Sequence, residues 1–195
     1  MKKILLALLL LGQSILSYSN VLKTKALCAA CHGEQGLSKN PLVPHLAGQQ
    51  LAYLLKQLQD FKRGTTRTTA LKTAVLSPLS AQDLSELADF YSQKPLPQAS
   101  VTEKFSKRGE LLYRGGDYKK RIMACIVCHG PKGYGNAEAG FPVLTGQRAA
   151  YTLSQLQAFK EKKRRNDLNA IMQTISAGMS QDDMEAVALY IQSLH

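Results

Sequence analysis

Apolar residues recur at three- and four-residue intervals in several stretches of the chain, the pattern of a helix with one buried face. Residues 49–62 show this pattern, and residues 147–160 show it again. Two further stripes follow Ser80 and Ser180, and each serine has an aspartate three positions later, which predicts a capped helix start. No convincing alternation of apolar and polar residues predicts a strand. We therefore expect an all-α protein.

The same pattern is present twice. Cys28–Gly33 recurs as Cys125–Gly130, 97 residues later. The order and spacing of residues persist downstream. Four residues of the stretch 49–62 return 98 positions later: Gln49, Tyr53, Gln57 and Phe61 correspond to Gln147, Tyr151, Gln155 and Phe159. The repeat predicts two homologous domains, residues 20–94 and 101–195, joined by a proline-rich linker at residues 95–100. Domains this small usually need a covalent cross-link, a metal or a cofactor to complete their cores. We also expect a helix from about residue 102 to 113, with residues 20–27 as its shortened counterpart.

The N-terminus has the features of a secretory signal peptide. Met1–Lys3 is positively charged, residues 4–11 are apolar, and small residues lie at Ser17 and Ser19. The apolar run is shorter than the ~20 residues that span a bilayer. We therefore predict cleavage after Ser19, export to the periplasm, and no transmembrane segment in the mature protein.

The cysteines supply the chemistry of both units. Cys-x-x-Cys-His is the pattern for covalent attachment of c-type haem: the two thiols add to the two vinyl groups on one edge of the porphyrin, and the adjacent imidazole binds the iron. The pattern predicts two haem c groups, anchored by Cys28 and Cys31 and by Cys125 and Cys128, with His32 and His129 as axial ligands. A zinc site would require the two cysteine pairs to converge, and a redox-active disulfide would require a βαβ context.

The chain resembles the dihaem class I cytochromes c of the cytochrome c4 type. The resemblance covers nearly the whole mature chain and is strongest in the second unit: Gly109-Glu110, Tyr113, Gly115-Gly116, Cys125–Gly130, Phe141-Pro142, Leu144, Gly146-Gln147, Gln155-Leu156, Arg165–Asp167 and Met172. It implies two tandem class I cytochrome c domains with one haem each. It also implies that the carbonyls of Pro44 and Pro142 orient the axial histidines.

The second axial ligand differs between the units. In the second unit Met172 precedes the last helix, where the family has its distal methionine, and we predict that Met172 binds the iron. The first unit, from residue 20 on, contains no methionine, and Lys72 occupies the matching position. Three alternatives remain there: Lys72 binds as a neutral amine, His45 binds, or the iron is five-coordinate or water-bound. We expect the first haem to have the lower potential.

These features favour a periplasmic electron carrier between a donor and an acceptor of a respiratory chain. The alternative is a small haem enzyme or ligand sensor that uses an open site at the first haem, similar to a peroxidase or a sulfur-compound-oxidising protein. The formal charge of +11 falls to +9 when residues 1–19 and their two lysines are removed, leaving 23 basic and 14 acidic residues. Charged runs at 119–121 and 160–165 are either solvated helix ends or a docking rim for an acidic redox partner. The family implies a membrane-bound terminal oxidase as one such partner, and an exported haem protein does not favour nucleic acid.

Overall fold

The computed structural model describes residues 24–99 and 106–194, and the predicted signal peptide lies outside them. Within these residues the structure is helical, with isolated bridges but no strand, as predicted. The helices are residues 24–32, α2 (Leu51–Arg63), α3 (Ala70–Leu76) and α4 (Ala81–Ser92), then α5 (Lys107–Gly115), α6 (Ile126–His129), α7 (Ala149–Lys160), the 3₁₀ turn η1 (Leu168–Ala170), α8 (Ile171–Ala177) and α9 (Gln181–Gln192). No helix in this part of the chain is both long and apolar enough to cross a membrane.

Each unit packs its helices around its own apolar core. In the first unit α2 lies against α3 and α4 and buries Phe61, Leu76 and Leu87. In the second unit α9 packs on α5 and α7, and α7 packs on α8. The α5–α9 crossing is close because Gly109 has no side chain: a Cβ atom there would lie 2.0 Å from the Ala186 carbonyl oxygen.

The final helices begin as predicted. Ser80 and Ser180 each accept the backbone N–H of the aspartate three positions later, and each aspartate in turn accepts the serine's backbone N–H. This arrangement satisfies N–H groups that a helix start leaves unpaired. Asp183 also accepts hydrogen bonds from Arg108 and Lys120, which ties α9 to the segment before the second Cys motif.

Two predicted elements differ in the structure. The described part of the expected 102–113 helix begins only at Lys107, because Ser106 caps it through the N–H of Gly109. In the first unit, residues 24–32 form one continuous helix that contains the Cys motif. The described part of that unit therefore has no separate counterpart of α5.

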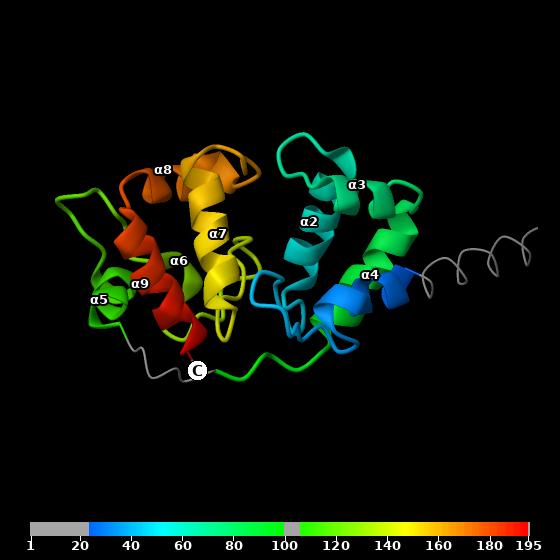
Figure 1. The fold of residues 1–195 in the computed structure, drawn as a ribbon, viewed down its shortest axis with the longest axis horizontal. Helices are drawn as coiled ribbons and strands as arrows, with labels where there is room; N and C mark the ends of the chain where they lie inside the picture. Colours follow the sequence, from blue (N-terminus) through cyan, green and yellow to red (C-terminus); the bar gives the residue numbers. More distant parts are fainter. Residues whose placement is uncertain (1–23, 100–105, 195) are drawn as a thin grey trace, which may run out of the picture.

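The two units lie side by side, with α2 and α7 facing each other at the boundary (Figure 1). Two glutamines cross it in opposite directions. Gln147 accepts from the N–H of His45 (2.9 Å) and donates to its carbonyl (3.0 Å), while Gln49 does the same to Val143 (2.9 and 3.0 Å). Each unit therefore fixes the backbone of the other.

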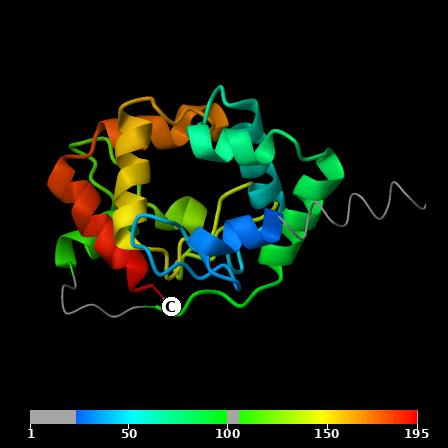
Figure 2. The ribbon, with the colours of Figure 1, turned by 45° about the vertical axis from the view of Figure 1, so that its right-hand side comes forward.

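Two arginines continue this reciprocal pattern at the far ends of α2 and α7, where the loops after these helices meet (Figure 2). Arg67 donates to Tyr151 (2.8 Å), and Arg164 donates to Tyr53 (2.8 Å). Each guanidinium also stacks over a phenylalanine of its own unit, Phe61 or Phe159. The boundary thus has an approximate twofold symmetry.

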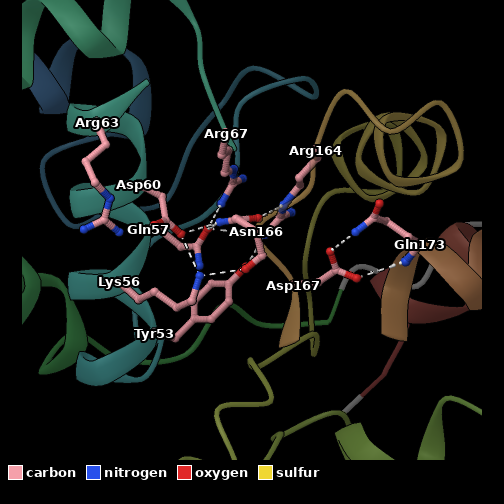
Figure 3. A network of polar contacts seen from close by, with 10 residues as sticks. All are labelled: Tyr53, Lys56, Gln57, Asp60, Arg63, Arg67, Arg164, Asn166, Asp167 and Gln173. Carbon is pink, nitrogen blue, oxygen red and sulfur yellow. Dashed lines mark hydrogen bonds and ion pairs between the residues drawn. The ribbon is translucent and has the colours of Figure 1, made fainter. Parts of the chain in front are cut away.

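Asn166 lies at the centre of this network (Figure 3). Its side-chain nitrogen donates to Gln57 and to Asp60, both at 2.7 Å, and its side-chain oxygen accepts from Arg164 at 3.0 Å. Asn166 and Arg164 belong to the second unit, while Gln57 and Asp60 belong to the first. All four are buried, so their polar groups depend on one another rather than on water.

The segment after α4 contacts both units. Leu96 lies against Gly48, where a Cβ atom would be only 2.6 Å from Leu96 Cδ2, and the Pro97 carbonyl lies close to Gly146. Both glycines have a positive φ, which most other residues adopt at a cost. The described part of the linker is therefore packed rather than free.

We expect Asn166→Ala to lower the free energy of unfolding by about 1–3 kcal/mol, because it leaves buried polar groups of both units unpaired. Chemical denaturation of the haem-loaded protein measures this change. Gln82→Ala is the matched control, since it removes only an exposed bond to Glu86 and should change stability by less than about 0.5 kcal/mol. Equal stability of the two variants would contradict the importance of the network.

Candidate haem centres

Both Cys motifs are on helices that end directly after the histidine. Cys28, Cys31 and His32 lie in the helix of residues 24–32, and Cys125 caps the short α6, which ends at His129. The next residue in each unit is a glycine with positive φ, 80° at Gly33 and 76° at Gly130. This conformation turns the chain away immediately, and glycine adopts it without strain.

The two histidines are held in the same way. His32 Nδ1 donates to the Pro44 carbonyl oxygen at 2.9 Å, and His129 Nδ1 donates to the Pro142 carbonyl oxygen at 2.9 Å. This confirms the proline contact that the family resemblance implies. Burial lowers the pKa of both imidazoles, although the carbonyl bonds oppose the shift. Because Nδ1 is the donor in each of these bonds, the neutral ring has the lone pair of Nε2 available for a metal.

None of the four cysteines forms a disulfide. Burial raises the pKa of Cys28, and it raises the pKa of Cys125 to about 12, so these two are not activated as redox nucleophiles. In the described residues no three His, Cys, Asp or Glu side chains come together as a metal cluster. Two pairs of cysteines, each pair followed by an imidazole that is held through its Nδ1, form a donor set that fits covalent haem c.

In the second unit Met172 lies on the same core as the Cys motif. Met172, Cys125 and Ile126 all pack against the buried cluster that includes Leu156 and Tyr113. This common position is what a haem between the thiols and a distal thioether requires. The prediction for Met172 is thus compatible with the packing.

The backbone before Met172 is fixed by an unusual turn. Asn169 and Ala170 have φ of 48° and 55°, a left-handed conformation that costs energy in residues other than glycine. Asp167 then accepts both the backbone N–H of Gln173 (3.0 Å) and its side-chain amide (2.7 Å), as Figure 3 shows. These contacts determine where α8 begins, and hence where Met172 is presented.

In the first unit Lys72 lies on α3, the counterpart of α8. Thr69 caps this helix by accepting the backbone N–H of Lys72. The ammonium nitrogen of Lys72 lies 4.1 Å from the ring centroid of Phe61, and the side chain is half-buried. The structure therefore turns this side chain toward the core, and Lys72 is not a freely solvated surface residue.

His45 has other partners. Its Nδ1 accepts the backbone N–H of Ser38 at 2.9 Å, and its own backbone is bonded to Gln147. Burial, followed by the charges of Arg148 and His32, lowers the pKa of His45 to about 4, so the ring is neutral. In this structure His45 joins the loop after the first Cys motif to the second unit.

The basic runs of the second unit are largely engaged within the protein. Arg164 is buried at the boundary, Lys163 pairs with Glu161, and the backbone N–H of Arg165 donates to the Thr66 carbonyl. In the other run Lys120 pairs with Asp183. The segment 160–165 therefore contributes to the junction between the units, a role that its charge pattern alone did not indicate.

Sequence reasoning missed the polar stripe that joins the units. Tyr53 and Gln57 are four residues apart and therefore lie on one face of α2, with Gln49 four residues earlier, just before the helix. Gln147, Tyr151 and Gln155 repeat the spacing at α7. The signal was the duplication of polar residues beside the apolar stripe. Polar positions repeated in two packed units are candidates for the contact between them.

Comparison with known proteins agrees with this architecture. The cytochrome c family matches residues 21–93 and 107–195. A cytochrome c4 from Stutzerimonas stutzeri is 45% identical over 179 residues, covering 87% of this chain and 85% of that protein. A thiosulfate dehydrogenase electron acceptor from Thiomonas intermedia is 39% identical over 173 residues, covering 85% and 77% of the two chains.

A solved structure gives the same result in three dimensions. The crystal structure of reduced recombinant cytochrome c4 from Pseudomonas stutzeri superposes with a TM-score of 0.85 and 44% identity, covering 92% of this chain and 98% of that one. The family match extends over both units and includes both Cys motifs. The chain therefore belongs to the cytochrome c family, as a dihaem electron-transfer cytochrome of the cytochrome c4 type.

Proposed function

We propose that this protein is exported to the periplasm, binds two haem c groups through Cys28, Cys31, Cys125 and Cys128, and carries electrons between redox proteins of a respiratory chain. The observation that carries the proposal is the pair of imidazoles, His32 and His129, each anchored at 2.9 Å to a proline carbonyl. Bound haem supplies the one-electron chemistry, the ferrous–ferric couple of its iron. The chain supplies ligands, orientation and a dry environment.

The residues of the chain keep the two centres fixed during this cycle. The residue after each of these prolines is held by a glutamine of the other unit. Gln147 holds His45, and Gln49 holds Val143. A rigid set of ligands limits the structural rearrangement that accompanies a change in the oxidation state of the iron. This favours a carrier over an enzyme that must open a site for a substrate.

The partners proposed for this carrier are redox proteins with acidic docking surfaces, a membrane-bound terminal oxidase among them. A relative described as a thiosulfate dehydrogenase electron acceptor supports a second source of electrons, an enzyme that oxidises sulfur compounds. In both cases the protein receives and passes on electrons and transforms no substrate. Lys119 and Arg121 are exposed cations shortly before the second Cys motif, and Lys132 is an exposed cation shortly after it; these charges are suited to steer an acidic partner.

Haem content is the direct test. We expect the exported protein to begin at Asn20 and to contain two haems c per chain, as measured by intact mass and a pyridine haemochrome assay. Replacing Cys125 and Cys128 together with alanine should leave one haem, because only the first motif remains. Wild-type protein without covalent haem would overturn the proposed function.

Met172→Ala should remove the thioether-to-iron absorption band of the second haem and lower that haem's potential, because thioether ligation raises the potential. Absorption spectroscopy with a redox titration measures both changes. Met179→Leu is the control, since Met179 is buried in the core of the same unit and should leave the band unchanged. A band that survives in Met172→Ala would rule out Met172 as the ligand.

A further inference from the structure

The first unit holds Lys72 where the second holds Met172, and the structure confirms this register. Lys72 lies eight residues before the N-cap Ser80, and Met172 lies eight residues before the N-cap Ser180. Between them, the carbonyl of Leu79 accepts from Lys62, and the carbonyl of Met179 accepts from Lys160. The two segments are thus anchored by equivalent contacts, and their side chains occupy equivalent places.

The amine of Lys72 has no polar partner among the described residues. It forms no ion pair and no hydrogen bond there, and its nitrogen lies over the face of Phe61. Phe61 is the counterpart of Phe159, which belongs to the second unit's α7. A half-buried ammonium that is not matched by a carboxylate is costly unless something else binds the nitrogen.

The charge of Lys72 acts on two groups of the first Cys motif. Burial raises the pKa of Cys28, and the charge of Lys72 opposes that shift; burial lowers the pKa of His32, and the charge of Lys72 adds to that shift. The amine therefore lies within electrostatic reach of the first Cys motif. Burial, together with the charges of Arg67 and Arg164, also lowers the pKa of Lys72 to about 8.

The other donors of the first unit are absent or occupied. The unit has no methionine after residue 20, and His45 Nδ1 accepts the Ser38 amide. Lys72 is therefore the donor of the first unit whose position in the repeat matches that of Met172.

We propose that the amine of Lys72 is the distal ligand of the first haem iron, a role that rests on the proposed attachment of that haem at Cys28 and Cys31. On binding, the ammonium group releases one proton to solvent and its nitrogen lone pair forms the bond to iron. Neither the nitrogen nor the iron changes oxidation state in this step. The site is then closed to external ligands.

The ligand sets the order of the two potentials. An amine is a harder donor than a thioether and stabilises ferric iron more strongly. The first haem should therefore have the lower potential, so that at equilibrium the first electron occupies the second haem. A redox titration should resolve two separate waves, and two equal high-potential waves would contradict the proposal.

Substitution of Lys72 tests the ligand itself. Lys72→Met should add a second thioether-to-iron band and raise the potential of the first haem. Lys72→Arg keeps the positive charge but cannot give up its proton, so one ferric haem should bind cyanide faster than in wild type, by about tenfold or more. Lys94→Met is the matched control, because Lys94 also lies 4.1 Å from a phenylalanine ring centroid, that of Phe90, in the same unit.

The outcomes separate this proposal from the proposed function. Two haems per chain with unchanged spectra, potentials and cyanide rates in the Lys72 variants would reject Lys72 as ligand and leave the carrier function intact. Fast cyanide binding to one haem of the wild type would also reject it, in favour of an open iron. If a Lys72 variant does not fold, the cyanide rate and the ferric electron paramagnetic resonance spectrum of the wild type still decide. Fewer than two haems in the wild type would instead contradict the proposed function.

Discussion

The hydrogen bond from each histidine Nδ1 to a proline carbonyl is the interaction on which the rest of the structure depends. It sets the tautomer of His32 and His129 and leaves Nε2 as the free donor. A carbonyl can hold a ring only if its own loop is held, and the next residue of each loop is clamped by a glutamine from the opposite unit. The packing of the two units therefore also determines the geometry of the two metal sites.

The two units share this frame but differ at buried positions of their cores. At positions where the first unit has Leu54 and Leu76, the second has Thr152 and Ser176 by the same repeat offsets. The hydroxyls of Thr152 and Ser176 are buried without a hydrogen-bond partner in the described part of the chain. The second unit is thus more polar at these two buried positions, while the first has the amine of Lys72. Duplication has preserved the scaffold and allowed the chemistry of each site to diverge.

The long helices and their starts could be predicted because their signals are local. The three- and four-residue spacing gave α2 and α7, and the serine–aspartate pairs gave the starts of α4 and α9. The cysteine motifs are likewise contained within six residues. In each case the physical cause lies within one or two helical turns.

The contacts that join the units could not be predicted in this way. Arg67 and Tyr151 are 84 positions apart, and nothing in the local sequence distinguishes the buried Arg164 from the exposed lysines beside it. The position of α8 depends on left-handed backbone at Asn169 and Ala170, where the sequence has no glycine to signal it. Such features follow from the packed state as a whole.

The reciprocity of the boundary has a consequence for a single unit. Arg67 meets Tyr151 as Arg164 meets Tyr53, and Gln49 meets Val143 as Gln147 meets His45. In an isologous dimer every contact occurs twice in this manner, because the same patch on each copy faces its twin. One unit therefore carries both halves of these four contacts, whereas Asn166, which bonds Gln57 and Asp60, has no asparagine as its counterpart in the first unit. In these contacts the boundary resembles the interface of a symmetric homodimer. The linker joins the two units in one chain, so each unit is always supplied with one partner.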